Sequence, residues 1–440
     1  MVPYGTKTWK PVDFSDLSLL RKKNRVIGMS FPRQDAALGL EPSILTVLPD
    51  GDNVEYDPIN RLYNDEDVLF YLCSVYISGY DEFVIWAGKH DKNKIVVGGY
   101  QPTTFPEEFT SHAWKVVRGP CDNFYVTIAQ EGQVVDGICT YDRLPRRDLY
   151  DIYKLNQQII PDKRVEDVVV SINTSLGCSQ TPACDFCCTP IMCPKLISKP
   201  IDLVTKEAQA LAIFKPRFCF IRDENFTMQA DWQRRLAIIH EALPETKLYL
   251  FASANTITSQ LKADYMVRKG VYMVCLGLED PTKDYAKNRN LDMVASYLKN
   301  SGIYMYLSFI VNPLEIVGKE AGEAFYTKLM ERFRELAPEM VCGNFLMPFR
   351  GTGLWDKYFQ FVGPEDYRYY DSKTPFLVRN PVLREKMKFY MFWYQWQYFT
   401  SDFYRDNVRR FDTGDTLHLR FEELYREFMP RYERIWNVRA

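Results

Sequence analysis

The sequence predicts an α/β protein made of two series of parallel strands followed by a mostly helical region. From Arg25 to about Ile128, short apolar strands alternate with helix-like stretches, which is typical of an open α/β domain with a parallel sheet. A second strand–helix series begins at Val168 and offers six candidate strands, enough for a partial barrel but too few for a closed one. Beyond Trp355 this alternation is lost.

The first series contains three expected strands and one expected helix. Val26–Ser30, Phe83–Trp86 and Lys94–Gly99 predict strands, whereas Asp67–Cys73 predicts a helix. Residues 1–23 are polar and form an expected lead-in, and polar stretches at 143–149 and 159–164 indicate a linker. The expected domains are therefore 1–150, 151–355 and 356–440.

The second series has a strand every few tens of residues, with helix-like segments such as Asp231–Leu243 and Leu291–Asn300 between strands. The candidate strands are Val168–Ile172, Phe218–Arg222, Lys247–Ala252, Val271–Gly277, Tyr304–Val311 and Met340–Leu346. The aromatic stretch Phe389–Phe399 predicts a helix that packs on the barrel, and a role in covering the substrate is the alternative.

Bulk properties narrow the functional class. The 440 residues are 46% apolar and 25% charged, and the net charge of −2 gives no basic footprint for nucleic acid. Five of the eleven cysteines lie within Cys178–Cys193, which is not the spacing of a secreted disulfide scaffold. We see no signal peptide and no apolar run of the roughly 18 residues that would span a membrane. We therefore expect a cytoplasmic protein without a nucleic acid or a membrane as its partner.

Three cysteines in one loop are the most informative feature of the chain. Cys178, Cys184 and Cys187 follow the apolar run Val168–Ile172, in a stretch rich in small and polar residues. Three thiolates can ligate three irons of a [4Fe–4S] cluster and leave the fourth iron open to a ligand. The alternative is a structural zinc site, for which Cys193 would supply the fourth ligand.

The cysteine loop resembles the signature of radical S-adenosylmethionine (SAM) enzymes. In that signature three residues separate the first two cysteines, two separate the last two, and an aromatic residue precedes the last. Phe186 occupies the aromatic position, and Ser175–Cys178 resembles the entry into the loop. The first gap holds five residues here, which a bulge in the loop accommodates. Cys188 and Cys193 are further thiols within reach, and we rank them below the other three.

Three later segments resemble the same family, in the family's order. Arg222–Thr227 is similar to the acidic segment with which many members meet SAM or substrate, Gly277–Asp280 to the Gly-Leu-Glu-Ser element, and Pro348–Thr352 to the Pro-Phe-Pro-Gly-Thr turn. All three follow strands, where barrel enzymes place their chemistry. The resemblance implies a cofactor-binding role for Phe186, Asp223, Glu224, Asn225 and Glu279. A solvated loop end is the alternative for the acidic residues, and Lys287 is interpreted as a solvated lysine.

In the first series, Val97–Glu108 resembles the Rossmann-like cobalamin-binding domain that precedes many radical SAM barrels. The family pattern there is Gly-Gly-x-His-Pro-Thr at a strand end. Paired glycines let the backbone approach a flat macrocycle, and the ligand is expected at the carboxyl ends of the strands. The resemblance implies contacts from Gly98, Gly99, Gln101, Pro102, Thr103 and Thr104, with Gln101 in place of the usual histidine.

The histidines bear on how cobalt would be ligated. Other cobalamin proteins ligate cobalt through an Asp-x-His-x-x-Gly motif, and none of the four histidines, His90, His112, His240 and His418, has that setting. A cobalt without a histidine ligand is common among the radical SAM relatives. We therefore expect cobalamin to bind here without one.

Together the resemblances imply a cobalamin-dependent radical SAM enzyme whose cofactors are a [4Fe–4S] cluster, SAM and cobalamin. The activity most directly implied is methyl transfer to an unactivated carbon, through a 5′-deoxyadenosyl radical and methylcobalamin. A non-methylating cyclisation or rearrangement is an alternative, and a cobalamin or Fe–S binding sensor is a rival from another class. An electron donor such as flavodoxin or ferredoxin is implied. The substrate, a small molecule or a peptide, and the catalytic residues stay unidentified.

Overall fold

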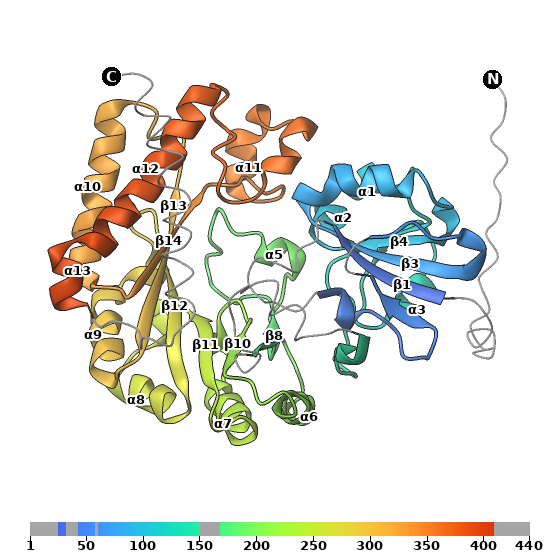
Figure 1. The fold of residues 1–440 in the computed structure, drawn as a ribbon, viewed down its shortest axis with the longest axis horizontal. Coiled ribbons are helices and arrows are strands. Elements are labelled where there is room, and N and C mark those ends of the chain that lie inside the picture. Colours follow the sequence, from blue (N-terminus) through green and yellow to red (C-terminus); the bar gives the residue numbers. More distant parts are fainter. Residues whose placement is uncertain (1–24, 32–42, 58–59, 150–167, 409–440) are drawn as a thin grey trace. The chain divides into compact units, whose positions relative to one another are not determined.

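A computed structural model describes residues 25–31, 43–57, 60–149 and 168–408. They fall into two compact units that divide near residue 151. In Figure 1 the first unit is blue to teal and the second runs from green to red. The expected lead-in, the linker stretch at 159–164 and His418 lie outside the described residues.

The first unit is built on a six-stranded parallel sheet with the strand order β2-β1-β3-β4-β5-β6. Its strands are β1 (Arg25–Phe31), β2 (Val54–Tyr56), β3 (Val68–Val75), β4 (Ile95–Gly98), β5 (Lys115–Arg118) and β6 (Val134–Asp136). Its helices are α1 (Tyr80–Ala87), α2 (Tyr100–Thr104) and α3 (Phe124–Ile128). One buried cluster contains side chains of α1 and another contains side chains of α3, and these two helices cover opposite faces of the sheet (Figure 1). The strand order reverses between β1 and β3, so this is where a doubly wound sheet binds its ligand.

Two predicted elements of the first unit are wrong. Asp67–Cys73, predicted as a helix, forms most of β3, because a central strand buried on both faces has no alternation to distinguish it from a buried helix. Phe83–Trp86, predicted as a strand, lies in α1. In that helix Phe83 and Trp86 face the core, whereas Ile85 is exposed and interrupts the amphipathic pattern.

The second unit has six parallel strands in sequential order, from β7 at one side of the sheet to β14 at the other. They are β7 (Val169–Ile172), β10 (Phe218–Ile221), β11 (Lys247–Ala252), β12 (Val271–Glu279), β13 (Tyr304–Val311) and β14 (Met340–Phe345). All six strands predicted from the sequence occur. A small antiparallel pair, β8 (Ser175–Leu176) and β9 (Ile197–Ser198), flanks the cysteine loop. The predicted fold class, a Rossmann-like unit with a partial barrel, is confirmed.

Helices α6 to α10 follow the strands and lie along the outside of the curved sheet, whereas α5 lies near the cysteine loop (Figure 1). The helices described in this unit are α5 (Thr189–Met192), α6 (Ile201–Ala212), α7 (Trp232–Ala242), α8 (Gln260–Arg268), α9 (Leu291–Ser301), α10 (Lys319–Leu336), α11 (Gly353–Tyr358), α12 (Pro381–Thr400) and α13 (Asp402–Asn407). At the amino ends of the strands the barrel interior is closed by a buried cluster of Phe218, Tyr249, Met273, Tyr304 and Met340. The other end, where loops follow the strands, is the end at which barrel enzymes hold their ligands.

The aromatic stretch Phe389–Phe399 forms part of α12 and packs on the barrel, as predicted. The ring of Tyr394 stacks on Tyr326 of α10 at 4.3 Å between centroids. Gln395 accepts a hydrogen bond from the Gly343 backbone N–H of β14 at 3.2 Å. Residues 356–408 thus belong to the second unit rather than standing apart from it.

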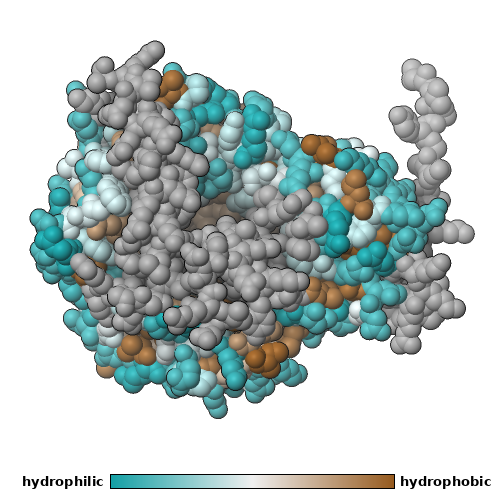
Figure 2. Space-filling view, viewed as in Figure 1, coloured by the Kyte–Doolittle hydropathy of each residue, from teal (hydrophilic) through white to brown (hydrophobic). Residues whose placement is uncertain are grey.

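No helix in the described part of the chain is both long and apolar enough to span a membrane. On the face drawn in Figure 2, hydrophobic residues are scattered among hydrophilic ones, apart from the grey atoms.

Candidate cofactor sites

The loop that carries the three cysteines is anchored by a buried carboxylate at its entry. Asp223, which follows β10, is fully buried. It accepts hydrogen bonds from the Thr174 N–H (2.6 Å) and Oγ1 (2.5 Å), from Ser175 Oγ (2.8 Å) and from Gln229 Nε2 (2.8 Å). With its oxygens occupied, Asp223 positions the chain that leads into the loop and offers no free carboxylate to a cofactor.

Cys178, Cys184 and Cys187 lie close enough to influence one another electrostatically. Burial raises the pKa of the Cys178 and Cys184 thiols, and the neighbouring thiols raise it further. Cys178 Sγ also lies 3.9 Å from Met228 Sδ. A metal or cluster bound by these sulfurs would hold them as thiolates and reverse this trend.

The two spare thiols have other surroundings. Cys193 is buried, and its Sγ donates to the Lys195 carbonyl at 3.0 Å. Cys188 is the residue before α5. Within the residues described, no group of three or more Cys, His, Asp or Glu is arranged around one point as a single metal ion requires.

Beside the loop, Glu279 and Lys287 form a largely buried ion pair. Glu279 ends β12 at a bulge and has a φ of 61°. The Lys287 ammonium lies 5.5 Å from the centre of the Phe186 ring, which also meets Tyr285 edge to face. Burial lowers the pKa of Lys287, but Glu279 and the Cys184 thiol raise it above its ordinary value overall.

Lys287 is therefore part of the site, contrary to the prediction of a solvated side chain. No signal in the sequence could have found it, because Lys287 belongs to no motif. Its position depends on the loop after β12 folding back toward Glu279.

Glu224 and Asn225 follow Asp223 and differ from it in exposure. Glu224 is exposed, yet the protein around it desolvates the carboxyl and raises its pKa to about 7. Its charge influences Cys178 and Cys193. Asn225 is buried and donates to Ser253 Oγ after β11 at 2.7 Å, which joins the ends of two neighbouring strands.

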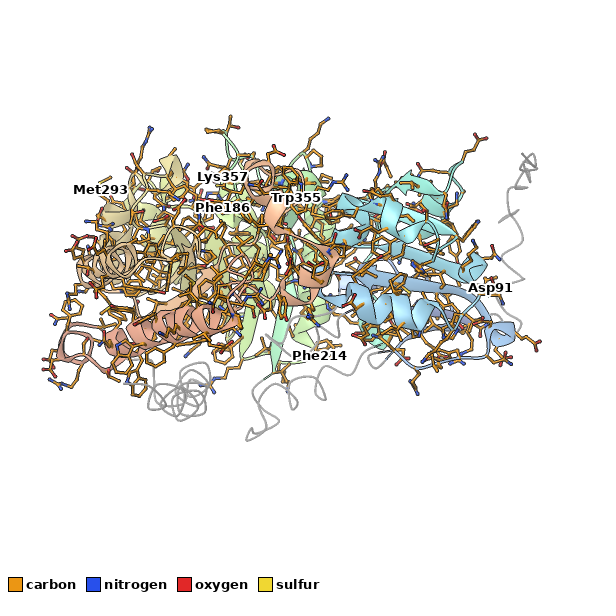
Figure 3. The ribbon with its side chains drawn as sticks, turned by 90° about the horizontal axis from the view of Figure 1, so that it is seen from above. Asp91, Phe186, Phe214, Met293, Trp355 and Lys357 are labelled. Atoms are coloured by element: carbon orange, nitrogen blue, oxygen red, sulfur yellow. The ribbon has the colours of Figure 1, made fainter. Side chains whose placement is uncertain are left out.

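The turn at Pro348–Thr352 packs against the cysteine loop. Thr352 caps α11 by accepting from the Trp355 N–H at 3.1 Å, and the Leu354 N–H donates to the Asp185 carbonyl at 3.2 Å. In Figure 3, Phe186 of the loop and Trp355 of α11 project to the same region. The structure thus brings together the cysteines, Phe186, Glu224, Glu279 and this turn at one end of the barrel.

In the first unit, Gly98–Thr104 lies at the carboxyl end of β4, beside the end of β3. Gly99 has a φ of 104°, and a Cβ there would lie 2.9 Å from the Val75 carbonyl oxygen. Thr103 Oγ1 donates to the Gly99 carbonyl at 2.7 Å and accepts from the Gly119 N–H at 2.9 Å. Thr104 donates to the α2 backbone, and Pro102 is buried.

Gln101 is fully buried and donates to Glu108 Oε2 at 2.9 Å. Its Oε1 has no hydrogen-bond partner among the residues described. A buried acceptor without a donor is rare, and a bound ligand is one explanation for it.

The histidines of the first unit lie at the opposite edge of the sheet. His90 follows α1 and precedes β4, and it bonds Asp65 ahead of β3 at 2.7 Å between Nδ1 and Oδ1. His112 precedes β5. Both are therefore at the amino ends of parallel strands, away from Gly98–Thr104.

Comparison by sequence finds no matching family model and no matching curated protein. Comparison of structures is informative: the chain has the fold of radical SAM enzymes, with a partial barrel and a separate α/β unit.

One of the matching structures is a radical SAM methyltransferase, TsrM, from Kitasatospora setae, solved with cobalamin and a [4Fe–4S] cluster bound. The two align with a TM-score of 0.57 at 14% identity, over 77% of this chain and 76% of that one. Methylornithine synthase (PylB) aligns at a TM-score of 0.33 and 14% identity, over 46% of this chain and 60% of that one. The FeFe-hydrogenase maturase HydG from Carboxydothermus hydrogenoformans aligns at 0.32 and 11%, over 54% and 60%. At 14% identity the likeness to TsrM establishes the fold alone.

Proposed function

We propose that this protein is a cobalamin-dependent radical SAM enzyme, and that it is a methyltransferase acting on an unactivated carbon. The observation that carries the proposal is the set of three neighbouring thiols in the loop after β7, in a barrel whose fold matches TsrM. Such a donor set fits a [4Fe–4S] cluster with one open iron. We also propose that it works in the reducing cytoplasm with a flavodoxin or ferredoxin as electron donor.

In this proposal Cys178, Cys184 and Cys187 hold the cluster. Three separate irons take the three thiolates, so the sulfurs need not converge on one point as they would for zinc. When bound, the cluster and SAM together supply hydrogen-atom abstraction, and cobalamin supplies a methyl group. Phe186, Glu224, Asn225 and Glu279 would line the SAM side of the site, while Asp223 positions the loop entry.

The cobalamin part of the proposal rests on the loop after β4. Gly98 and Gly99 have no side chains, so a ligand can approach the backbone closely at this carboxyl end of β4. This strand end is near the reversal of strand order, where doubly wound sheets bind ligands. The orphaned Oε1 of Gln101 offers a buried acceptor there. Pro102, Thr103 and Thr104 complete the proposed contacts. The position of His90 and His112 at the other edge supports binding without a histidine ligand.

The test uses anaerobically purified protein, as the wild type and as five variants in each of which one cysteine is replaced. Cys178→Ala, Cys184→Ala and Cys187→Ala should each lose the brown colour and most of the iron, whereas Cys188→Ala and Cys193→Ala should retain them. A colourless wild-type protein that holds one zinc would overturn the proposal in favour of the structural zinc site.

The reaction is tested by its SAM-derived products, which do not depend on knowing every substrate detail. With reductant, SAM and substrate, formation of both 5′-deoxyadenosine and S-adenosylhomocysteine would support radical methylation. 5′-Deoxyadenosine without the homocysteine product would favour the non-methylating alternative. Cluster and cobalamin binding with neither product would favour a sensor.

A further inference from the structure

One wall of the barrel interior is polar, and it is formed by β13, β14 and the segment before α12. Side chains alternate along these strands: Phe309 packs on Phe333 of α10, so its neighbour Ser308 faces the interior. Gly343 meets Met391 of α12, so Cys342 and Asn344 also face inward. These inward residues are partly exposed, whereas the outward ones are buried.

The polar wall lies above the apolar cluster that closes the amino end of the barrel. Tyr306 is one inward step beyond the buried Tyr304, and its hydroxyl lies beside the thiols of Cys342 and Cys275. Burial and these thiols hold the pKa of Tyr306 well above its ordinary value. Asn344 Nδ2 donates to Ser308 Oγ at 3.1 Å. Ser308 and Asn344 carry no charge, and the raised pKa keeps the Tyr306 hydroxyl neutral near pH 7.

The charge on this wall comes from Lys373, which reaches it from the segment between Tyr369 and α12. Its ammonium donates to the Gly343 carbonyl (2.6 Å), Asn344 Oδ1 (2.9 Å) and Cys342 Sγ (3.3 Å). These partners are a backbone carbonyl, an amide oxygen and a cysteine sulfur, and none of them is a carboxylate. Over the described residues, no carboxylate pairs with this ammonium, and Asp371 instead accepts from the backbone of its own segment and from the Thr374 hydroxyl. A partly buried cation without a counter-ion favours an anion beside it.

The opposite side of the interior carries aromatic rings. Phe220 of β10 and Phe251 of β11 meet edge to face at 5.1 Å, and Phe251 is 37% exposed. A ligand between the two sides would meet aromatic rings on one side and the ammonium of Lys373 on the other.

We propose that Lys373 and the polar wall select a substrate that bears a carboxylate next to an apolar or aromatic body. One cation with few further donors suits the single charge of a carboxylate; phosphate sites usually combine several donors or a helix N-terminus. This inference rests on the proposed function, because it takes the barrel interior as the substrate site. The inference adds to the proposed function the chemical class of the substrate and the residue, Lys373, that binds its carboxylate.

The test exploits the thiol of Cys342, which lies beside Lys373. We compare the rate at which Cys342 reacts with iodoacetate, a carboxylate, and with iodoacetamide, its neutral analogue, by peptide mass spectrometry. A change in the thiolate fraction alters both rates equally, so their ratio reports the local attraction for a carboxylate. The ratio in the wild type should exceed that in Lys373→Met about fivefold, the size expected for one unit charge at contact distance in a water-like medium. Lys373→Arg should keep the wild-type ratio.

Cys139, in the first unit, is the internal reference, and its ratio should be the same in all three proteins. Benzoate should slow the reaction of wild-type Cys342 with iodoacetamide, whereas benzamide should not. An equal ratio in wild type and Lys373→Met, or protection by phenyl phosphate but not by benzoate, would overturn the inference. These readouts need no cluster, so a protein that lacks one but passes this test would refute only the proposed function.

Discussion

Replacing Asp223 with alanine should destabilise the barrel and also lower the amount of iron that the cysteine loop binds. The carboxylate is fully buried and takes two hydrogen bonds from Thr174, one from Ser175 and one from Gln229. Without it the Thr174 N–H has no acceptor, and two hydroxyls must find new ones. Gln229 keeps a partner, because its Nε2 also donates to Thr174 Oγ1 at 2.9 Å.

Each buried donor left unpaired costs about 1–3 kcal/mol. Burial raises the pKa of Asp223, so the wild-type carboxylate itself carries a desolvation cost that the variant no longer bears. We therefore expect Asp223→Ala to lose about 3–5 kcal/mol, a large part of the roughly 5–15 kcal/mol of a typical domain. The melting temperature should fall on the order of 10 °C.

The assay is thermal unfolding followed by circular dichroism, together with iron content after anaerobic reconstitution. Asp292→Asn is the matched control, because among the described residues the Asp292 carboxylate forms an ion pair at the surface with Arg332, and its loss should cost less than about 1 kcal/mol. An Asp223→Ala protein with the melting temperature and iron content of the control would refute the view that this carboxylate holds the loop entry.

Three further predictions concern backbone space, pH and charge. A Cβ at Gly99 would lie 2.9 Å from a backbone oxygen of β3, so Gly99→Ala should cost about 2 kcal/mol or more in urea unfolding, whereas Gly98→Ala, with a nearest contact of 3.6 Å, should be tolerated. The pKa of Glu224 is raised from 4.5 to about 7, so the wild type should lose stability relative to Glu224→Gln as the pH rises from 5 to 8, and parallel melting curves would contradict this. In iron-loaded protein, Lys287→Met should make the reduction potential of the cluster more negative and Glu279→Gln should make it less negative, because the two side chains carry opposite charges near Cys184. The potential is measured by redox titration followed by electron paramagnetic resonance. A shift in the same direction for both variants would indicate a structural effect rather than an effect of charge.

The sequence was most informative where a motif or a strand pattern is local. The six barrel strands and the β4 turn follow from apolar runs and glycines that are contiguous in the chain. The exchange of helix and strand at β3 and α1 shows the limit, since β3 is apolar on both faces and α1 exposes Ile85. There the packing of the sheet, not the local pattern, decides the element.

The site was predictable only as far as its motifs reach. The cysteines and Glu279 lie in recognisable segments, but whether a side chain is open to a ligand depends on distant partners. The Asp223 carboxylate is already hydrogen-bonded to Thr174 and Gln229, and Lys287 lies at the site because it pairs with Glu279. Lys373 reaches the barrel from a segment without any motif, so no pattern in the sequence could have placed it.

The segment after the barrel covers the edge strand β14, and a shortened protein would lose this cover. β14 pairs only with β13 in the described sheet, so its other side could recruit a foreign strand. That side is instead occupied: the Gly343 N–H is bonded by Gln395, and the Phe345 N–H by the Ser372 carbonyl at 2.8 Å. A chain that ends at residue 355, where the strand–helix alternation stops, would lose both partners. The backbone N–H groups of Gly343 and Phe345 would then be unpaired at the edge of the sheet. Such a truncated chain should aggregate, because β14 of one molecule could pair with β14 of another. The helix α12 and the segment before it therefore also prevent self-association.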